Sequence, residues 1–388
     1  MTDVAGTIRV ERDRSDADKR MNVLGIETSC DETAAAVVST TGVASRPWIV
    51  RANVIASQAG IHREWGGVVP EIASRQHVRD ICGVVDRALG DAGTHWRDLD
   101  ALAVTQGPGL VGALLVGVSF AKAAAAAVGR PIVAVHHLAG HIESIFLEHG
   151  AIPLPAVVLV VSGGHTSLYV VPEPGVYRLA GRTRDDAAGE AFDKVARVIG
   201  LGYPGGPAID RVARDGNDGA VDLPRPRFTH ADRHPLPVDV RGSDGAPPVA
   251  DFSFSGLKSA VVRLVQQRGG AEALTRTAVA DIAATFQRVV VETLLDRTFE
   301  VAHTLGARSI GIAGGVSANS RLRHDATARG QREGVPVFVP PLALSTDNAA
   351  MIAAAGLRRL ERGESSGLGF NAHASLPIAG EGWPSGAR

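Results

Sequence analysis

Blocks of apolar residues separated by polar turns predict a repeated strand–turn–strand pattern. Residues 23–27 and 34–38 are rich in β-forming side chains, and the polar stretch between them carries an acidic pair. A second such pattern spans 156–171, with a Ser-Gly-Gly turn at its centre. Because the two patterns lie about 130 residues apart, they predict two related α/β lobes.

Other apolar runs add strands and helices to both lobes. Strands are predicted at 101–105, 131–135, 309–313 and 335–339. The last of these is followed by a helix at 349–360, and the polar cluster Ser-Thr-Asp-Asn before it is typical of a helix N-terminus.

The most apolar stretch is the alanine-rich helix predicted after the turn at 107–109. Its continuous apolar part, 110–121, ends at Lys122 and is too short to span a bilayer. We therefore expect a buried helix of a globular protein and no membrane segment.

Composition divides the remaining chain into lobes, a loop and two tails. Residues 1–20 mix acidic and basic side chains without an apolar period and lack a signal-peptide core, and 216–250 are rich in Pro, Asp, Arg and Gly. The predicted segments are a disordered tail at 1–20, a first lobe at 21–135 plus about 345–376, a second lobe at 136–344 with an inserted surface loop at 216–250, and a loose tail at 377–388.

Bulk composition excludes several classes of protein. The net charge is -1, so the whole chain does not have the basic character of a nucleic-acid-binding domain. Cys30 and Cys82 are too few for a disulfide framework, which favours a reducing cytoplasm. Acidic neighbours would raise the pKa of the Cys30 thiol, so that cysteine is interpreted as structural.

The pair His137 and His141 has the spacing of a two-histidine metal site. On a helix the two imidazoles stand one turn apart on one face. The spacing is that of the metalloprotease motif H-E-x-x-H, but Leu138 occupies the position of the glutamate base. A metal would need a further, distant oxygen ligand, and an ordinary surface pair of histidines is the alternative.

Glycine-rich turns follow three of the predicted strands. Residues 107–112 match G-x-G-x-x-G but lack the acidic residue of a dinucleotide site, so a close-packed turn is favoured there. The Gly-Gly pairs at 163–164 and 314–315 lie where α/β sheets bind ligands, and each alone could be a simple turn. Asp347 is either a hard metal ligand or an ordinary helix cap.

Two groups of carboxylates are further candidates. Asp31 and Glu32 form a pair suited to orienting a nucleophile or a cation, with a solvated turn as the alternative. In the predicted helix 185–194, Glu190, Asp193 and Lys194 share one face, as they also would on a salt-bridged surface.

Eight motifs in one order identify a family resemblance. From about residue 22 to 375 the chain resembles TsaD, the tRNA adenosine threonylcarbamoyltransferases, once called O-sialoglycoprotein endopeptidases. The motifs that carry it are GIETSCDET at 25–33, HLAGH at 137–141, VSGGHT at 161–166, DDAAGEAFDK at 185–194, YPGGP at 203–207, SFSGLK at 253–258, GGVSAN at 314–319 and TDNAAM at 346–351.

The resemblance implies a fold, an activity and a metal. The fold is α/β and two-lobed, actin-like as in Hsp70 and sugar kinases, with duplicated ribonuclease-H-like lobes. The activity is transfer of the threonylcarbamoyl group of threonylcarbamoyl-AMP to N6 of adenosine 37, in tRNAs that read codons beginning with A, with release of AMP. One divalent metal, expected to be Fe²⁺, would be held by His137, His141 and Asp347.

The resemblance also implies substrate contacts and partners. Asp31 and Glu32 would orient the reaction or accept the N6 proton. Partners would be tRNA, threonylcarbamoyl-AMP and the proteins TsaB and TsaE, in the cytoplasm. The substrate-contacting positions are Val160, Val161, Ser162, Gly163, Gly164, Asp193, Gly206, Asp210 and Asn319.

The chain departs from the family pattern at two places, and two rival functions remain. His136 stands where relatives often carry asparagine, and the loop from about 229 to 250 is longer than usual. A zinc-type endopeptidase would lack its base because of Leu138. An actin-like ATP-binding protein without transferase activity would not need the histidine pair, since such kinases hold Mg²⁺ through carboxylates and phosphates.

Overall fold

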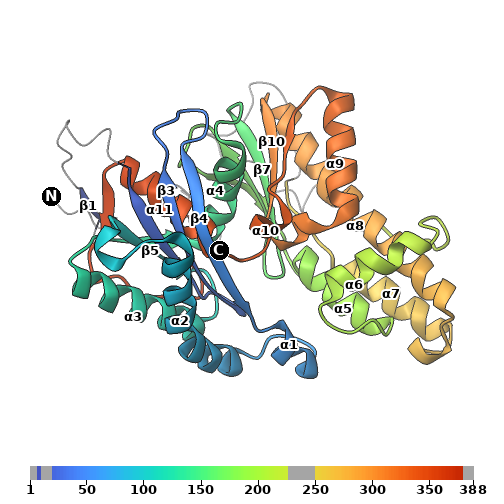
Figure 1. Cartoon of the computed structure of the whole chain (residues 1–388). Coiled ribbons are helices and arrows are strands. Elements are labelled where there is room, and N and C mark those ends of the chain that lie inside the picture. The colour runs from blue at the N-terminus through green and yellow to red at the C-terminus, as the bar shows by residue number, and fades with distance from the viewer. Residues whose placement is uncertain (1–6, 10–19, 226–249, 379–388) are drawn as a thin grey trace, which may run out of the picture. The chain divides into compact units, whose positions relative to one another are not determined.

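The computed structural model describes residues 7–9, 20–225 and 250–378 (Figure 1). Their contacts define two compact units. Unit 1 contains the described residues of Met1–Ala151 and Asp347–Ala379, and unit 2 contains those of Ile152–Thr346. Each unit is an α/β domain built around its own sheet.

Unit 1 has a sheet with the strand order β1-β12-β6-β5-β2-β3-β4. Strands β2, β5 and β6 are parallel, and β3 and β4 continue the sheet antiparallel. The strands are β1 (Thr7–Arg9), β2 (Asn22–Glu27), β3 (Glu32–Thr40), β4 (Trp48–Ser57), β5 (Ala101–Gly107), β6 (Ile132–His136) and β12 (Glu364–Ser366).

Both faces of this sheet are covered by helices. Leu24 and Ile26 of β2 pack into a core with α2 and α3, whereas Gly25 faces α11, where an added Cβ would lie 2.7 Å from the backbone nitrogen of Ala353. Burial on both faces explains why these strands are apolar at successive positions. The helices are α1 (Ala59–His62), α2 (Pro70–Ala92), α3 (Val111–Val128), α4 (His137–His149) and α11 (Ala349–Glu361), with 3-10 turns η2 (Arg63–Trp65) and η3 (Trp96–Asp98).

Unit 2 has a sheet with the order β11-β10-β7-β8-β9. The strands are β7 (Ala156–Val161), β8 (Thr166–Val171), β9 (Arg178–Arg182), β10 (Ser309–Ala313) and β11 (Val337–Phe338). The helices are α5 (Ala188–Val198), α6 (Gly205–Val212), α7 (Ser255–Gln267), α8 (Arg276–Thr304), α9 (Ser320–Glu333) and α10 (Leu342–Ser345), with 3-10 turns η4 (Ala213–Asp215), η7 (Ala271–Ala273) and η8 (Gly315–Ala318).

The same strand arrangement occurs in both units. In unit 1 the antiparallel pair β2–β3 lies beside the parallel neighbour β5, and in unit 2 the antiparallel pair β7–β8 lies beside the parallel neighbour β10. The two strand–turn–strand patterns are therefore equivalent positions of a duplicated α/β design, as the sequence predicts.

Several predicted boundaries differ from the structure. Residues Thr7–Arg9 of the predicted disordered tail pair with β12. Helix α4, assigned from sequence to the second lobe, groups with unit 1 because it packs on α11, with Gly140 close to Ile352 and Met351. Most of the inserted loop and all but the start of the C-terminal tail lie outside the described residues.

Helix α3 is only 33% buried. By length and composition it could cross a membrane, but Ala113, Leu114 and Val118 pack into the core of unit 1. Its other side is exposed and still apolar, with Val111 at 44% and Leu115 at 43% exposure. The prediction of a buried helix holds for the side that packs on the core and not for this side, because α3 covers the sheet with one face only.

Candidate metal centre and ligand-binding loops

His137, His141 and Asp347 form a compact group in unit 1. One ligand atom from each residue lies within 4.8 Å of the others. The two histidines are in the first turns of α4, and Asp347 directly precedes α11. Close packing of α4 on α11 at Gly140 brings the distant carboxylate to the histidines, so this predicted set is assembled.

Asp347 does not cap its helix. The cap of α11 is Asn348, whose side chain accepts a hydrogen bond from the Met351 N–H. The Asp347 carboxylate instead lies 3.1 Å from His141 Nε2 and 3.6 Å from His137 Nε2. Of the two interpretations of this aspartate, the structure therefore favours a ligand over a cap.

The environment of His141 fits a metal ligand. The residue is fully buried, and neither ring nitrogen has a hydrogen bond of good geometry to any described residue. Burial lowers the pKa of His141, which favours the neutral imidazole that binds metals. Two imidazoles and a carboxylate form a donor set that suits zinc or iron.

Glu27 holds the other histidine in place. Its Oε2 lies 3.0 Å from His137 Nδ1 and also accepts a hydrogen bond from the Thr105 hydroxyl at 2.7 Å. Burial opposes charge on His137, but the carboxylates of Asp347 and Glu27 outweigh it and raise its pKa to about 9. Glu27 is a site residue that sequence reasoning missed, although it lies in the first motif.

His136 takes the role of a helix cap. Its Nδ1 accepts a hydrogen bond from the Leu138 N–H at 3.1 Å, and its Nε2 donates to the carbonyl of Leu376 at 2.8 Å. An asparagine cap accepts the same hydrogen bond, which explains why histidine can replace it here. His136 stays outside the metal group, as expected.

The acidic pair Asp31 and Glu32 lies in the turn between β2 and β3. Burial, and then the charges of Asp31 and Asp347, raise the pKa of Glu32 well above its ordinary value. Burial is also the main cause of the raised pKa of the Cys30 thiol, followed by Asp31. Asp31 is 8% exposed and Glu32 is partly buried, so the solvated-turn alternative does not fit Asp31.

A buried histidine forms hydrogen bonds to the residues on either side of this acidic pair. His77 of α2 donates from Nε2 to the Cys30 carbonyl at 3.0 Å, and its Nδ1 accepts from the Thr33 hydroxyl at 2.8 Å. Gln58 lies 3.4 Å from the same Nδ1. Burial lowers the pKa of His77, so the ring is a neutral structural link.

In unit 2, tightly packed glycines stand beside glycines that face open space. An added Cβ on Gly189 would lie 2.6 Å from the Ser162 carbonyl, and one on Gly314 would lie 2.5 Å from that of Val161. At Gly163, Gly164 and Gly206 an added Cβ would meet no described atom within 4 Å. The three predicted substrate-contacting glycines are thus open, and their packed neighbours shape the loops.

The remaining predicted substrate positions are held by hydrogen bonds. Val160 and Val161 are fully buried strand residues, so only their backbone could face a ligand, and the Ser162 hydroxyl accepts from the His165 N–H. Asp193 accepts from the Gly205 N–H at 2.7 Å. Asn319 accepts from the Leu322 N–H as the cap of α9.

The rest of the 185–194 segment is a charged surface. Lys194 lies 2.7 Å from Asp186 and 2.9 Å from Glu190, which matches the salt-bridged alternative. The predicted close-packed turn is also present, since a Cβ on Gly109 would lie 2.6 Å from the Ser29 carbonyl.

Fold and site together define a class of protein. Duplicated α/β units give the chain an actin-like, ATPase-type fold, here with a His-His-Asp group able to hold a metal. The crystal structure of full-length HypF, in its phosphate- and nucleotide-bound form, shares the fold with a TM-score of 0.53 at 12% sequence identity, covering 92% of this chain and 48% of that one.

Within this class the chain belongs to the TsaD family, tRNA N6-adenosine threonylcarbamoyltransferase, whose model matches residues 49–354. A relative with that name from Moorella thermoacetica is 51% identical over 92% of this chain and 97% of its own length. One from Anaeromyxobacter dehalogenans is 51% identical over 90% of this chain and 97% of its own.

Proposed function

We propose that this chain transfers a threonylcarbamoyl group to N6 of adenosine 37 in tRNAs that read codons beginning with A. The observation that carries the proposal is the His-His-Asp group, assembled by α4 and α11, in a chain about half identical to transferases of that name. The endopeptidase alternative is not favoured, because Leu138 is an apolar, buried residue at the position of the required base.

The donor is threonylcarbamoyl-AMP. Nitrogen N6 attacks the carbamoyl carbon, a C–N bond forms, the bond from that carbon to the phosphate oxygen breaks, AMP leaves, and N6 loses a proton. The open glycines Gly163, Gly164 and Gly206 support binding of the donor in unit 2, since bare backbone N–H groups suit phosphate and carboxylate oxygens.

We assign His137, His141 and Asp347 to one divalent metal, with iron as the expected ion. When bound there, the metal would supply Lewis-acid chemistry. Glu27 fixes the orientation of the His137 ring, so that Nε2 is the nitrogen directed toward Asp347.

Asp31 and Glu32 are proposed to orient the reaction or to accept the N6 proton. Burial raises the pKa of Glu32, so its carboxylate takes up a proton more readily than an ordinary one, which supports the second role.

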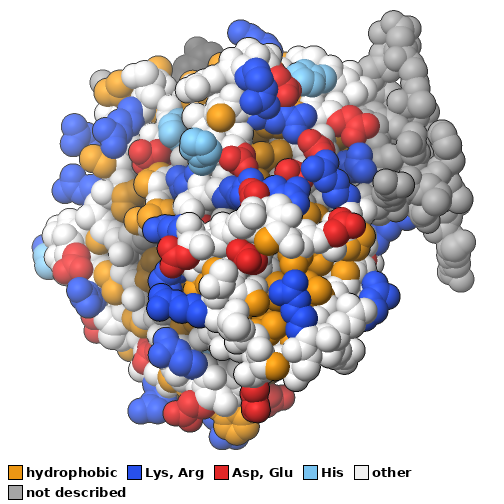
Figure 2. Space-filling view, turned by 90° about the vertical axis from the view of Figure 1, so that its right-hand side faces the viewer, with side chains coloured by type: hydrophobic (Ala, Val, Ile, Leu, Met, Phe, Trp, Pro, Cys, Tyr) orange, Lys and Arg blue, Asp and Glu red, His pale blue; other side chains and the backbone are white. Residues whose placement is uncertain are grey.

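TsaB and TsaE are the proposed protein partners, in the cytoplasm. The exposed apolar side of α3, together with Val78 of α2 at 63% exposure, supports helix-mediated docking of one of them. Basic and acidic side chains are interspersed on the face drawn in Figure 2, which supports a role for partners in holding the tRNA.

Reconstitution with defined components tests the proposal. Purified chain, TsaB, TsaE, threonylcarbamoyl-AMP and unmodified tRNA should yield threonylcarbamoyladenosine, measured by liquid chromatography of nucleosides. His141→Ala and Asp347→Ala should abolish the product, whereas His149→Ala, an exposed histidine of the same helix, should not. Full activity of either metal-ligand variant would overturn the metal assignment. Proteolysis that depends on these histidines, without modified tRNA, would instead favour the endopeptidase alternative.

A further inference from the structure

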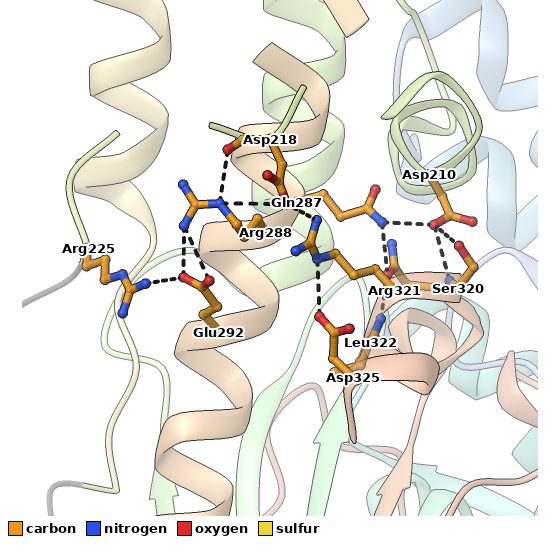
Figure 3. A network of polar contacts seen from close by, with 11 residues as sticks. Asp210, Asp218, Arg225, Gln287, Arg288, Glu292, Ser320, Arg321, Leu322 and Asp325 are labelled. Carbon is orange, nitrogen blue, oxygen red and sulfur yellow. Dashed lines mark hydrogen bonds and ion pairs between the residues drawn. The ribbon is translucent and has the colours of Figure 1, made fainter. Parts of the chain in front are cut away.

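Gln287 contacts two of the predicted substrate-binding residues at once, and Figure 3 shows its contact with Asp210. It lies on α8 and is 4% exposed. Its Nε2 is 3.1 Å from Asp210 Oδ1 and 3.5 Å from Asn319 Oδ1. A carboxylate only accepts hydrogen bonds, so the Gln287 amide must direct its NH₂ group toward Asp210.

The contact with Gln287 determines which polar atoms of Asp210 and Asn319 remain for a ligand. Asp210 Oδ1 is already occupied by hydrogen bonds within unit 2, since it also accepts from the Ser320 N–H at 3.2 Å and the Ser320 hydroxyl at 2.7 Å. Asn319 Oδ1 accepts from the Leu322 N–H at 3.0 Å and is turned inward as well. The groups left to a ligand are therefore the second Asp210 oxygen, an acceptor, and the Asn319 NH₂ group, a donor.

An acceptor beside a donor matches a ribose hydroxyl, which donates one hydrogen bond and accepts others. The second oxygen of Asp210 has only a 3.5 Å contact with Arg214, whose side chain is 66% exposed. A surface ion pair of this length is weak and leaves the oxygen available to a sugar.

Gln287 fills this role at the expense of stability. Its own Oε1 is buried and has no hydrogen-bond partner within the described part of the chain. A buried carbonyl without a partner destabilises a fold, and an apolar side chain of similar shape would avoid that loss. Packing alone therefore does not account for an amide at this position.

We propose that Gln287 is a positioning residue of the nucleotide site, which orients Asp210 and Asn319 toward the ribose of the donor. The inference rests on the proposed function, which puts the adenylate of the donor in unit 2. Replacement of a purely structural residue would lower stability and affinity together. Replacement of Gln287 by an apolar residue should lower the affinity without lowering the stability.

The test uses the full chain and AMP, the leaving group, as the probe in calorimetric titrations. Gln287→Met should weaken AMP binding by about 3- to 10-fold, the effect expected for loss of a hydrogen bond, with an unchanged or higher melting temperature. Gln287→Leu, which likewise offers no donor to Asp210, should weaken binding to a similar extent. Gln266→Met, an exposed position of α7, is the matched control and should change neither quantity.

A double-mutant cycle shows whether Gln287 acts through its partners. In an Asn319→Ala background, Gln287→Met should weaken AMP binding clearly less than in the wild type. Wild-type AMP affinity in Gln287→Met, or full additivity with Asn319→Ala, would overturn the inference while leaving the proposed function intact. If the wild-type chain failed to bind AMP at all, the donor site in unit 2 would be wrong, and the inference with it.

Discussion

Glu27 and His137 are joined in the interior of unit 1 by a 3.0 Å contact between Oε2 and Nδ1. Glu27 is fully buried, and its Oε1 also accepts a hydrogen bond from the Ser29 N–H at 2.5 Å. A carboxylate on the far nitrogen of a ligating histidine is a common support of metal sites. The end of strand β2 thus orients a histidine on a helix more than 100 residues later.

Replacement of this carboxylate should weaken metal binding. Glu27→Gln keeps the size of the side chain but removes the charge, so we expect a loss of about 10- to 100-fold in metal affinity. Metal per chain, measured by mass spectrometry after equilibration with buffered iron or zinc, checks this without an activity assay. Glu148→Gln, at an exposed position of α4, should retain the wild-type metal content. An unchanged metal content in Glu27→Gln would contradict the assignment.

The open and packed glycines should respond in opposite ways to alanine. Gly189→Ala forces a Cβ to within 2.6 Å of the Ser162 carbonyl and should cost about 1–3 kcal/mol of unfolding free energy, as overpacking does. Gly163→Ala should fold normally, because its Cβ meets no described atom, but should lower transfer activity at least about tenfold by intruding on the donor. Urea unfolding and initial rates measure the two effects, and equal loss of stability in both would refute the distinction.

Asp185 should stabilise the fold in a pH-dependent manner. Burial alone would raise its pKa, but hydrogen bonds from Ser253, Phe254 and Ser255 outweigh it and lower the pKa. The stability that the carboxylate contributes is therefore present above the unfolded pKa of about 3.9 and is lost as the pH falls through the lower folded value.

Asp185→Asn tests this sign directly. The variant should be less stable than the wild type at pH 7, and the gap should narrow as the pH falls below about 4. Denaturant titrations at pH 7, 5 and 3 give the difference, with Asp215→Asn, in the 3-10 turn η4, as a surface control. A gap that widens on acidification would reverse the sign and exclude the explanation.

The pair Arg358 and Glu143 links the two helices that carry the metal ligands. Glu143 is fully buried and accepts from Arg358 Nε and Nη2 at 3.0 to 3.2 Å, while the guanidinium also lies over the ring of Trp48. Arg358→Met removes this cation from a buried carboxylate and should cost about 3–5 kcal/mol. The double variant with Glu143→Leu should regain most of this in thermal unfolding, and failure to do so would show that the loss is not electrostatic.

The chain alone should bind tRNA weakly. Its net charge is -1, so few phosphates can be neutralised without a local patch or a partner. Filter-binding assays at 50 and 200 mM salt should give weak, partner-dependent binding. Tight binding by the isolated chain that falls steeply with salt would contradict this expectation.

Local patterns in the sequence determined the order of strands and helices, because a buried strand is recognised by apolar side chains at consecutive positions. The hairpins at β2–β3 and β7–β8, the start of α4 and the one-turn spacing of His137 and His141 all follow from such patterns. The helices α2 and α8 were not foreseen, since their buried positions are spread among polar ones and carry no motif. For the third residue of the metal group, Asp347, local pattern left a helix cap as the alternative, and the family resemblance favoured the ligand.

Tertiary packing decided what the individual site residues do. The local sequence does not distinguish Glu27 from any other carboxylate at the end of a strand, or Gly163 from Gly189. The residues next to Gln287 in sequence do not indicate that it contacts Asp210 or Asn319. Each of these roles depends on atoms from elements far apart in the chain. The packing of α4 on α11 makes a metal group from residues that separately would be a histidine pair and a helix start, because a ligand set is defined by distances between side chains and not by their spacing in sequence.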